Sequence, residues 1–354
     1  MAALPSRPAR NWGARVHEVT MACVRAVVLE NELLRVTVLA GLGSDVIEFC
    51  YKPRDLDATW LSPGGLRDPR QAAGAAADDV SAFLDRYRGG WQEVLPNGGA
   101  PSRHRGAALA QHGEVSGLPW DAEVTADDAA AVEVTFSVRT TRMPLRVSKT
   151  MRLAAGAAQL TISESVTNEA AVPVAAMWGQ HLAYGPPLLV PGCRIKVPNG
   201  LAVTPHPDPI NPPRRLVAAG GPWEWPVVPA ADGGEADLSV VPPWGAPSDI
   251  VYLSGFTEGW YELLDPAGTV GVRVEWDAAV LPYLWLWTEL GASRDYPWWG
   301  QGRVLGLEPF SSYPTSGLAE AVANGTALDL PPGGRRELRW RIGIVDTEVR
   351  TTCG

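Results

Sequence analysis

The stretch CVRAVVLENELLRVTVLAGLGSDVIEF, residues 23–49, predicts how the fold begins. Its three apolar runs are separated by two short breaks, ENE at 30–32 and GLGS at 41–44. Breaks this short act as tight turns between neighbouring strands, so the runs pair antiparallel and side by side. We therefore expect the chain to open as a three-stranded antiparallel meander.

The same two-residue period continues in later parts of the chain. Apolar side chains recur at every second position with polar residues between them, which is typical of half-buried strands. The positions are Val132, Val134, Phe136 and Val138; Leu145, Val147, Met151 and Leu153; Leu160 and Ile162; and Leu338, Trp340, Ile342 and Ile344. Helix signals are scarce, and the best candidate is DDVSAFLDRYR at 78–88, which begins on Asp78 and stops at Gly89 and Gly90.

Residues 205–247 interrupt this pattern with eleven prolines, together with Trp223, Trp225 and Trp244. Because so many prolines break a strand ladder, we expect a long loop there. No internal repeat and no linker-like composition marks a domain boundary. The sequence therefore predicts an all-β fold: one domain over residues 1–354, built as a large antiparallel β-sandwich with long loops at one end.

Composition narrows the class of partner. The 354 residues carry a formal charge of −9, and their Lys and Arg residues are not clustered. The chain thus lacks a basic surface for nucleic-acid phosphates, and no apolar run reaches the length of a membrane span, so we expect neither partner. Fifteen tryptophans against five phenylalanines fit a small sugar ligand, because an indole stacks on the apolar face of a sugar and offers an N–H donor; core packing explains some of them equally well.

The start of the chain and its cysteines bear on its compartment. The first residues, MAALPSRPARNWGARV, lack the continuous apolar segment of a secretory signal, so we expect a cytoplasmic protein. The four cysteines form no Cys-x-x-Cys pair, which favours free thiols over a zinc or redox site. The sequence carries no signal of oligomeric state.

Four short segments place polar side chains beside glycine, proline or aromatic residues. They are GGWQEVLPNGG (89–99), QHGEVSGLPW (111–120), MWGQHLAYGPP (177–187) and GRVLGLEPFSSYP (302–314). Taken alone, His181 in a loop is typical of a surface residue. Likewise, Glu308 before Pro309 is typical of a solvated strand end, where the proline stops the ladder. The four segments together differ from what each suggests alone.

In wording and order these segments resemble those of the galactose mutarotase (aldose 1-epimerase) superfamily. The resemblance implies a supersandwich of antiparallel sheets, a single galactose mutarotase-like domain and no cofactor. By match to the motifs, His181 would be the general acid, Glu308 the general base and His112 an auxiliary hydrogen-bonding residue. The sugar contacts would include three further residues of the same segments, Asn97, Gln180 and Trp178.

The chemistry of anomer exchange explains these residue types. One group removes the proton of the C1 hydroxyl while another protonates the ring oxygen, and the ring opens to the aldehyde. Rotation about C1–C2 and reclosure then reverse the two roles. A carboxylate and an imidazole suffice, because each positioned acid or base contributes about 10² to 10⁴ in rate. The resemblance therefore predicts an isomerase that needs no metal and no redox cofactor.

Two departures from the family limit what carries over. The branch that acts on hexose 6-phosphates reads roughly His-Gly-Phe-Ala-Arg, whereas this chain has Glu114 and Ser116 within that segment. A phosphate would be repelled by Glu114 unless Arg103 or Arg105 compensated, which favours an unphosphorylated sugar. The family's sugar-binding Asp has its nearest match at Asp249.

The aromatic residues of LPYLWLWTELG (281–291) offer a stacking surface. Tyr283, Trp285 and Trp287 fall on one face of a strand, either as a buried sheet face or as the floor on which a sugar ring stacks. Trp285 and Trp287 are our candidates for that floor, and Trp178 and Trp91 are the rivals.

Two other functions fit the same residues. A Trp-rich sandwich that binds sugar without turnover would need neither His181 nor Glu308. A metal-dependent sugar isomerase or lyase would use the two together with His112 and Glu114 as ligands of a divalent ion. The joint presence of an acid and a base in matching segments favours the mutarotase.

Overall fold

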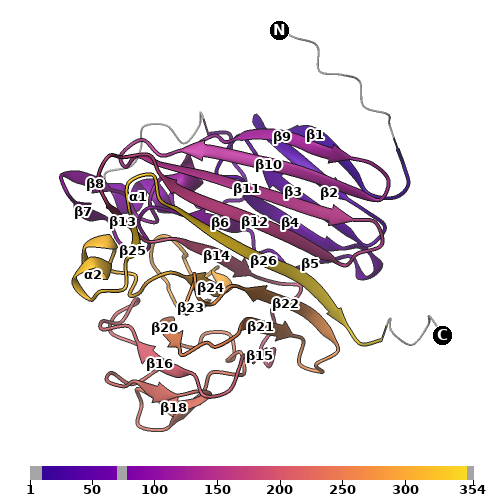
Figure 1. The fold of residues 1–354 in the computed structure, drawn as a ribbon. Coiled ribbons are helices and arrows are strands. Elements are labelled where there is room, and N and C mark those ends of the chain that lie inside the picture. Colours follow the sequence, from indigo (N-terminus) through magenta and orange to yellow (C-terminus); the bar gives the residue numbers. More distant parts are fainter. Residues whose placement is uncertain (1–9, 70–77, 349–354) are drawn as a thin grey trace.

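The computed structural model describes residues 10–69 and 78–348, and strands dominate it (Figure 1). The larger sheet runs in the order β1-β2-β3-β4-β6-β14-β24-β23-β20-β16-β17, with β5 beside β4. Its strands are β1 (Arg15–Met21), β2 (Val24–Glu30), β3 (Leu34–Leu39), β4 (Asp45–Tyr51), β5 (Leu56–Asp57), β6 (Trp91–Val94), β14 (Gly179–Tyr184), β16 (Ala202–Pro205), β17 (Trp223–Glu224), β20 (Asp249–Ser254), β23 (Tyr283–Leu290) and β24 (Arg303–Phe310).

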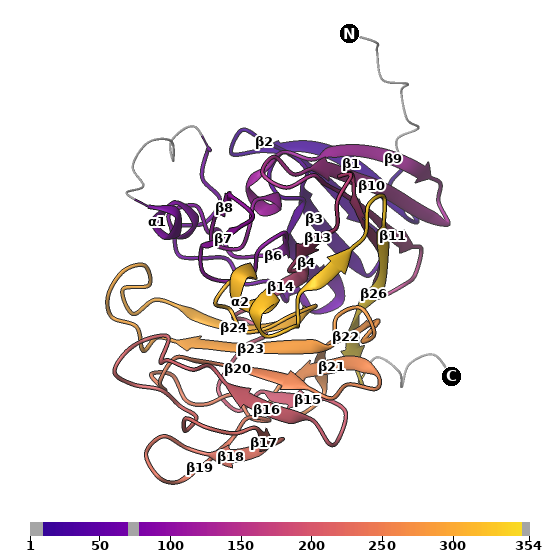
Figure 2. The same cartoon turned by 60° about the vertical axis from the view of Figure 1, so that its left-hand side comes forward.

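The second large sheet packs against the first and runs in the order β15-β21-β22-β26-β12-β11-β10-β9 (Figure 2). Its strands are β9 (Asp121–Asp127), β10 (Ala131–Arg139), β11 (Leu145–Ala154), β12 (Gln159–Asn168), β15 (Arg194–Lys196), β21 (Gly259–Leu264), β22 (Val270–Trp276) and β26 (Arg335–Asp346). Short pairs are β7 (Ser102–His104) with β8 (Ala107–Leu109), β13 (Val174–Ala176) with β25 (Leu328–Leu330), and β18 (Val227–Pro229) with β19 (Glu235–Asp237). The antiparallel β-sandwich expected from the sequence is confirmed.

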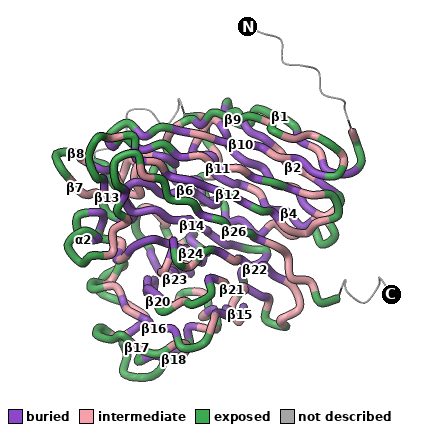
Figure 3. Tube along the Cα trace, viewed as in Figure 1, coloured by how far each residue is buried: buried purple, intermediate pink, exposed green. Residues whose placement is uncertain are grey.

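The strand predictions hold in detail. The three predicted strands of the opening meander are β2, β3 and β4, and a fourth strand, β1, precedes them and pairs with β2. The alternating apolar residues of β10, β11, β12 and β26 are buried, with Ile344 only partly so (Figure 3). Residues 205–247 form only the short strands β17, β18 and β19 between irregular segments. No helix in the described part of the chain has the length and apolar character to cross a lipid bilayer.

Two local predictions differ from the structure. Helix α1 covers Asp79–Leu84 and ends before the predicted residue 88; Asp78 caps it by accepting a hydrogen bond from the Ser81 N–H. Strand β24 does not stop at Pro309 but runs through it, because the φ angle that proline fixes is compatible with an extended strand. Glu308 is consequently a buried residue within the sheet rather than a solvated strand end. The second helix, α2, spans Leu318–Ala323.

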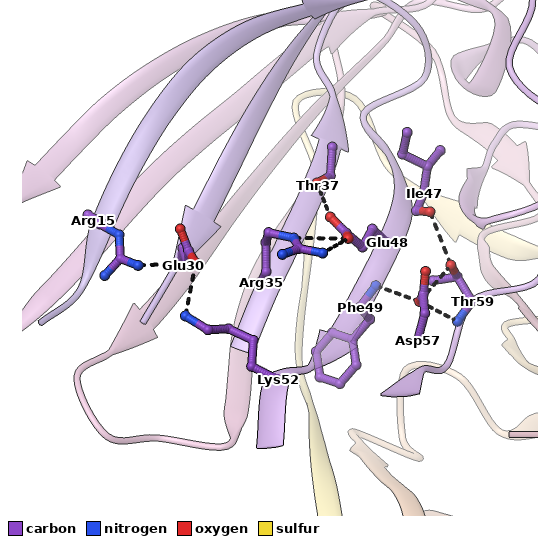
Figure 4. Close-up of polar contacts among 10 residues, drawn as sticks. All are labelled: Arg15, Glu30, Arg35, Thr37, Ile47, Glu48, Phe49, Lys52, Asp57 and Thr59. Carbon is purple, nitrogen blue, oxygen red and sulfur yellow. Dashed lines mark hydrogen bonds and ion pairs between the residues drawn. The ribbon is translucent and has the colours of Figure 1, made fainter. Parts of the chain in front are cut away.

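Polar contacts hold the outer face of the opening meander (Figure 4). Glu48 of β4 accepts hydrogen bonds from Arg35 and Thr37 of β3 at 2.6 Å. Asp57 of β5 accepts from the Phe49 N–H and the Thr59 N–H, both at 3.0 Å. These bonds fix β3, β4 and β5 against one another, next to the position where β4 pairs with β6.

A buried polar cluster joins the two sheets. Glu93 of β6 accepts hydrogen bonds from Trp178 Nε1 at 2.5 Å and Gln180 Nε2 at 2.9 Å. Gln180 Nε2 also donates to Glu164 of the second sheet at 2.8 Å. The ammonium of Lys149 lies 3.5 Å from Glu93 and donates to the Ser44 carbonyl at 3.1 Å. Lys149 is therefore the counter-ion of this cluster.

Replacing Lys149 by Met should lower the free energy of unfolding by about 3 to 5 kcal/mol, because breaking a buried pair leaves an uncompensated carboxylate. The matched control is Lys52→Met, which removes a partly exposed pair with Glu30 at 2.9 Å and should cost about 1 kcal/mol or less. Urea denaturation measures both. Equal, small losses would show that the inter-sheet cluster does not depend on Lys149.

Candidate functional site

The register between β14 and β24 places His181 opposite Glu308. Gly179 pairs with Phe310 and Ala183 with Gly306, so the residue midway on each strand faces the other. Both side chains lie on the same face of the sheet, and His181 Nε2 is 3.8 Å from Glu308 Oε1. They are 4% and 2% exposed, respectively. An imidazole and a carboxyl therefore face each other in a nearly enclosed space.

The same row continues across the sheet on both sides. On β6, Gln92 pairs with His181, and its Nε2 donates to Asp45 of β4 at 2.6 Å. On β23, Trp285 pairs with Glu308, and Tyr252 of β20 pairs with Trp285. Because cross-strand partners point to the same face, His181 and Glu308 are flanked by an amide on one side and an indole on the other.

Gly306 makes room for the Glu308 carboxyl. A Cβ at this position would lie 2.3 Å from Glu308 Oε1 and 3.2 Å from Trp287 Cε3. Since real atoms do not approach so closely, any larger residue would displace the carboxyl or the indole. The Leu-Gly-Leu-Glu pattern of β24 is thus part of the geometry of the site.

His112 reaches the pair from the loop before β9. Its backbone has a positive φ of 54°, and its ring lies edge-on to that of His181 with centroids 5.2 Å apart. Its Nδ1 accepts a hydrogen bond from the Gly99 N–H at 3.4 Å. In the neutral ring this leaves the proton on Nε2, where it can be donated.

Aromatic side chains enclose the three polar groups. Tyr87, from the segment after α1, places its hydroxyl 3.5 Å from His181 Nδ1. The ring centroid of Trp287 of β23 lies 5.9 Å from that of His181. The Trp298 ring lies between the two aromatic residues, with its centroid 6.2 Å from that of Tyr87 and 6.0 Å from that of Trp287. Phe83 lies 4.8 Å from His112. The segment 78–88 and the loop 291–302 therefore wall the site.

Burial dominates the electrostatics of the site. It raises the pKa of Glu308 well above its usual range and lowers the pKa of His181 to about 4. Burial and the neighbouring His181 also lower the pKa of His112 well below its usual range. In the empty site both imidazoles are neutral near pH 7, and burial favours Glu308 over His181 as the holder of a proton shared by the pair.

The structure brings His112, His181, Glu308 and Trp287 together. Trp285 lies beside Glu308 on the same sheet face, but its ring face is covered, and the other candidates lie elsewhere. Trp285 stacks on Phe310 at 3.6 Å between ring centroids. Gln180 and Trp178 donate to Glu93 in the cluster between the sheets. Trp91 lies on the same face of β6 as Glu93, opposite to the face that carries Gln92. For Gln180 the cause is strand alternation, which turns it away from the face that carries His181.

Asn97 and Asp249 both hold loops. Asn97 donates to the Ala100 and Ala110 carbonyls at 2.8 and 2.9 Å and accepts from the Leu318 N–H at 2.7 Å. Asp249 accepts from the N–H groups of Leu216 and Val217 at 2.9 and 2.8 Å, which anchors the proline-rich segment. Their polar groups are engaged by the backbone in this structure.

Of the four residues proposed as metal ligands, Glu114 lies apart from His112, His181 and Glu308. Glu114 accepts hydrogen bonds from the N–H groups of Thr141 and Arg142, so its carboxylate holds a neighbouring loop. Within residues 10–69 and 78–348, no three His, Cys, Asp or Glu side chains form a group that could hold a metal ion.

Sequence reasoning missed a polar patch beside the pair. Arg88 forms a buried ion pair with Asp45, which also accepts from Gln92. Four buried polar atoms here lack a hydrogen-bond partner: Ser44 Oγ, Asp45 Oδ1, Arg88 Nε and Gln92 Oε1. Because unsatisfied buried groups are uncommon in folded proteins, this patch is a candidate place for a polar ligand. Arg88 directly precedes the Gly-Gly of the first motif, which was the available signal.

The chain is similar to known proteins in two ways. Residues 21–212 match the sequence model of a family described as a domain of unknown function, DUF4432, whereas no curated protein sequence matches. A provisionally assigned aldose 1-epimerase from Klebsiella pneumoniae has a similar structure, with a TM-score of 0.71 and 16% identity over 95% of this chain and 88% of that one. A galactose mutarotase-like protein from Clostridium acetobutylicum has a TM-score of 0.65 and 13% identity over 94% and 99%. At these identities the likeness shows the fold.

Replacing Glu308 by Gln should stabilise the folded protein at neutral pH. Because the pKa of Glu308 is raised, the folded state holds a proton that the unfolded state releases above its ordinary pKa, so the carboxyl costs more stability as pH rises. The variant should gain on the order of 1 kcal/mol or more at pH 8, the scale of one unit of pKa difference between folded and unfolded states, and little near pH 4. Urea denaturation across this range measures the difference.

The matched control is Glu48→Gln, because the Glu48 carboxylate is ion-paired with Arg35 at 2.6 Å. This variant should be less stable than the wild-type protein. If Glu308→Gln were destabilising at every pH, the Glu308 carboxyl would not be a buried, poorly satisfied group.

Proposed function

The chain belongs to the DUF4432 family of domains of unknown function, and from this starting point we propose that it is an isomerase of the aldose 1-epimerase (mutarotase) type. Its substrate is an unphosphorylated sugar, whose anomers it interconverts by ring opening and reclosure. The galactose mutarotase-like fold supports this class of enzyme, and the residue types of the site support this reaction.

One observation carries the proposal: His181 and Glu308 face each other from adjacent strands with Nε2 and Oε1 3.8 Å apart. Anomer exchange needs one proton donor and one proton acceptor at two oxygens bonded to the same carbon, the ring oxygen and the C1 hydroxyl. Two groups on neighbouring strands of one sheet face can reach both oxygens of a single sugar ring.

The proton transfers follow from this placement. The Glu308 carboxylate takes the proton of the C1 hydroxyl, the bond between C1 and the ring oxygen breaks, and His181 Nε2 protonates that oxygen. The open aldehyde rotates about C1–C2. Its carbonyl is then attacked on the other face by the hydroxyl that was the ring oxygen, while His181 accepts the proton and Glu308 returns one to O1. No proton is gained or lost over the cycle.

A single proton on the pair is sufficient. In the empty site, burial places that proton on Glu308 and leaves His181 neutral. Hydrogen bonds from a bound sugar replace the lost hydration of the carboxylate and allow the proton to shift to the imidazole. Because opening and reclosure exchange the roles of acid and base, the pair is competent with the proton on either residue.

The surrounding groups have supporting roles. His112 donates through Nε2 to a sugar oxygen, since its Nδ1 is occupied by the Gly99 N–H. Trp287 offers its indole face to the apolar face of the ring. The sugar reaches the buried pair when the segment carrying Tyr87 or the loop carrying Trp298 moves aside, and closure then excludes water from the open aldehyde.

The charges of the site favour an uncharged sugar. Arg88, the buried cation of the polar patch, is already neutralised by Asp45. Arg105 donates to the Pro173 carbonyl at 2.7 Å. A phosphate dianion would therefore enter without a free cation among these residues to balance it.

Glu308→Gln and His181→Asn should each slow anomer exchange by about 10² or more, the usual scale for a positioned acid or base, while sugar binding is largely kept. The double variant should be scarcely slower than the worse single variant, because both groups act on one transition state. NMR saturation transfer between the anomeric protons of several aldoses measures the exchange.

His17→Asn is the control, since His17 lies on the exposed edge strand β1. Wild-type exchange rates in both site variants, with sugar still bound, would overturn the acid–base roles and favour a sugar-binding protein without turnover.

The preference for an unphosphorylated sugar is tested separately by comparing the affinities for glucose and glucose 6-phosphate. We expect glucose to bind more tightly at every salt concentration. Tighter binding of the phosphate that weakens steeply with salt would show that Arg88, Arg103 or another cation receives it.

A further inference from the structure

Two adjacent tryptophans in the loop 291–302, Trp298 and Trp299, lie in different environments. Trp298 packs inside, with its ring 5.6 Å from Trp60 and 6.0 Å from Trp287. Trp299 is 63% exposed. The loop therefore presents one indole to the acid–base site and the next to solvent, directly beside the wall of the site.

The backbone holds Trp299 in an unfavourable conformation. Its φ is 50°, in the left-handed region, which costs a bulky residue on the order of 1 kcal/mol. Hydrogen bonds fix this geometry: Trp299 N–H donates to the Asp295 carbonyl at 2.9 Å, and Gly300 N–H to the Ser293 carbonyl at 2.7 Å. The strain is thus maintained for a ring that contributes little to the core.

A buried carboxylate anchors the same loop. Glu289, at the end of β23, accepts hydrogen bonds from the Gly291 N–H at 3.0 Å and the Ser293 N–H at 3.3 Å. The hydroxyls of Ser248 and Ser293 donate to its other oxygen. The loop that carries Trp299 is consequently tied to the sheet at its base.

A second exposed ring lies on this loop. Tyr296 is 46% exposed, and its hydroxyl donates to Asp85 Oδ1 at 2.9 Å. Asp85 belongs to the segment that carries Phe83 and Tyr87, so the bond joins the two walls of the site on their outer side. Trp299 and Tyr296 are thus exposed aromatic rings on the outer side of the loop that walls the site.

We propose that Trp299, assisted by Tyr296, forms a subsite for a second sugar ring, and that the substrate class is a reducing oligosaccharide. This rests on the proposed function for the ring that is turned over. The reducing end, which alone carries a free anomeric hydroxyl, enters the acid–base site, and the remaining rings extend outward past the loop. There a pyranose stacks its C–H face on the exposed indole, as aromatic platforms do with apolar surfaces. Arg294 and Asp295 beside it give no net charge, which suits an uncharged sugar.

The test compares dissociation constants, measured by NMR titration, for glucose and for maltose, cellobiose and lactose, which share glucose as their reducing ring. At least one disaccharide should bind the wild-type protein about tenfold more tightly than glucose, the scale of one stacking contact. In Trp299→Ala the ratio of the two dissociation constants should fall to about one, and Trp299→Phe should restore most of it. Trp12→Ala removes an indole that is 62% exposed near β1 and should leave the ratio unchanged.

Equal affinities of all three disaccharides and glucose for the wild-type protein would overturn the subsite, as would a disaccharide preference that survives in Trp299→Ala. The two proposals fail separately. Absence of anomer exchange together with disaccharide binding that depends on Trp299 contradicts the isomerase and supports the subsite, whereas exchange without the preference does the reverse.

Discussion

The antiparallel register of β14 against β24 is the constraint on which the site depends. It sets the His181 imidazole across from the Glu308 carboxyl, and the row extends to Gln92 on one side and Trp285 on the other. A slip of one residue would turn every one of these side chains to the opposite face. Gly306 completes the arrangement, because only a missing side chain lets the carboxyl lie where it does.

The burial of His181 and Glu308 determines their protonation and lowers the stability of the empty protein. The aromatic walls remove water from Glu308 and His181, so the charged forms of both become unfavourable and one proton stays within the pair. Such a site destabilises the empty protein, as functional sites commonly do. In the proposed reaction, a sugar that supplies hydrogen bonds to the pair would offset that cost, and the dry surroundings would strengthen those bonds.

Strand positions and motif residues were predictable, and side-chain surroundings less so. Two-residue alternation in β10, β11 and β26 gave the sandwich, and the four motif segments named His112, His181 and Glu308. Alternation along β14 also implies that Gln180 faces away from His181, a consequence that motif matching overlooks. The walls contributed by Tyr87 and Trp298 could not be predicted, because both lie on loops whose paths depend on long-range contacts such as the Tyr296–Asp85 hydrogen bond.

The pH dependence of anomer exchange by the wild-type protein tests the central claim most directly. If a buried pair shares one proton, the catalysed rate should be constant from slightly above pH 4 through neutrality. It should fall near pH 4, where His181 takes up a second proton, and at high pH, where Glu308 loses its proton at its raised pKa. A rate that instead follows the titration of an ordinary imidazole near pH 6.5, or no catalysed exchange with sugar bound, would contradict the account.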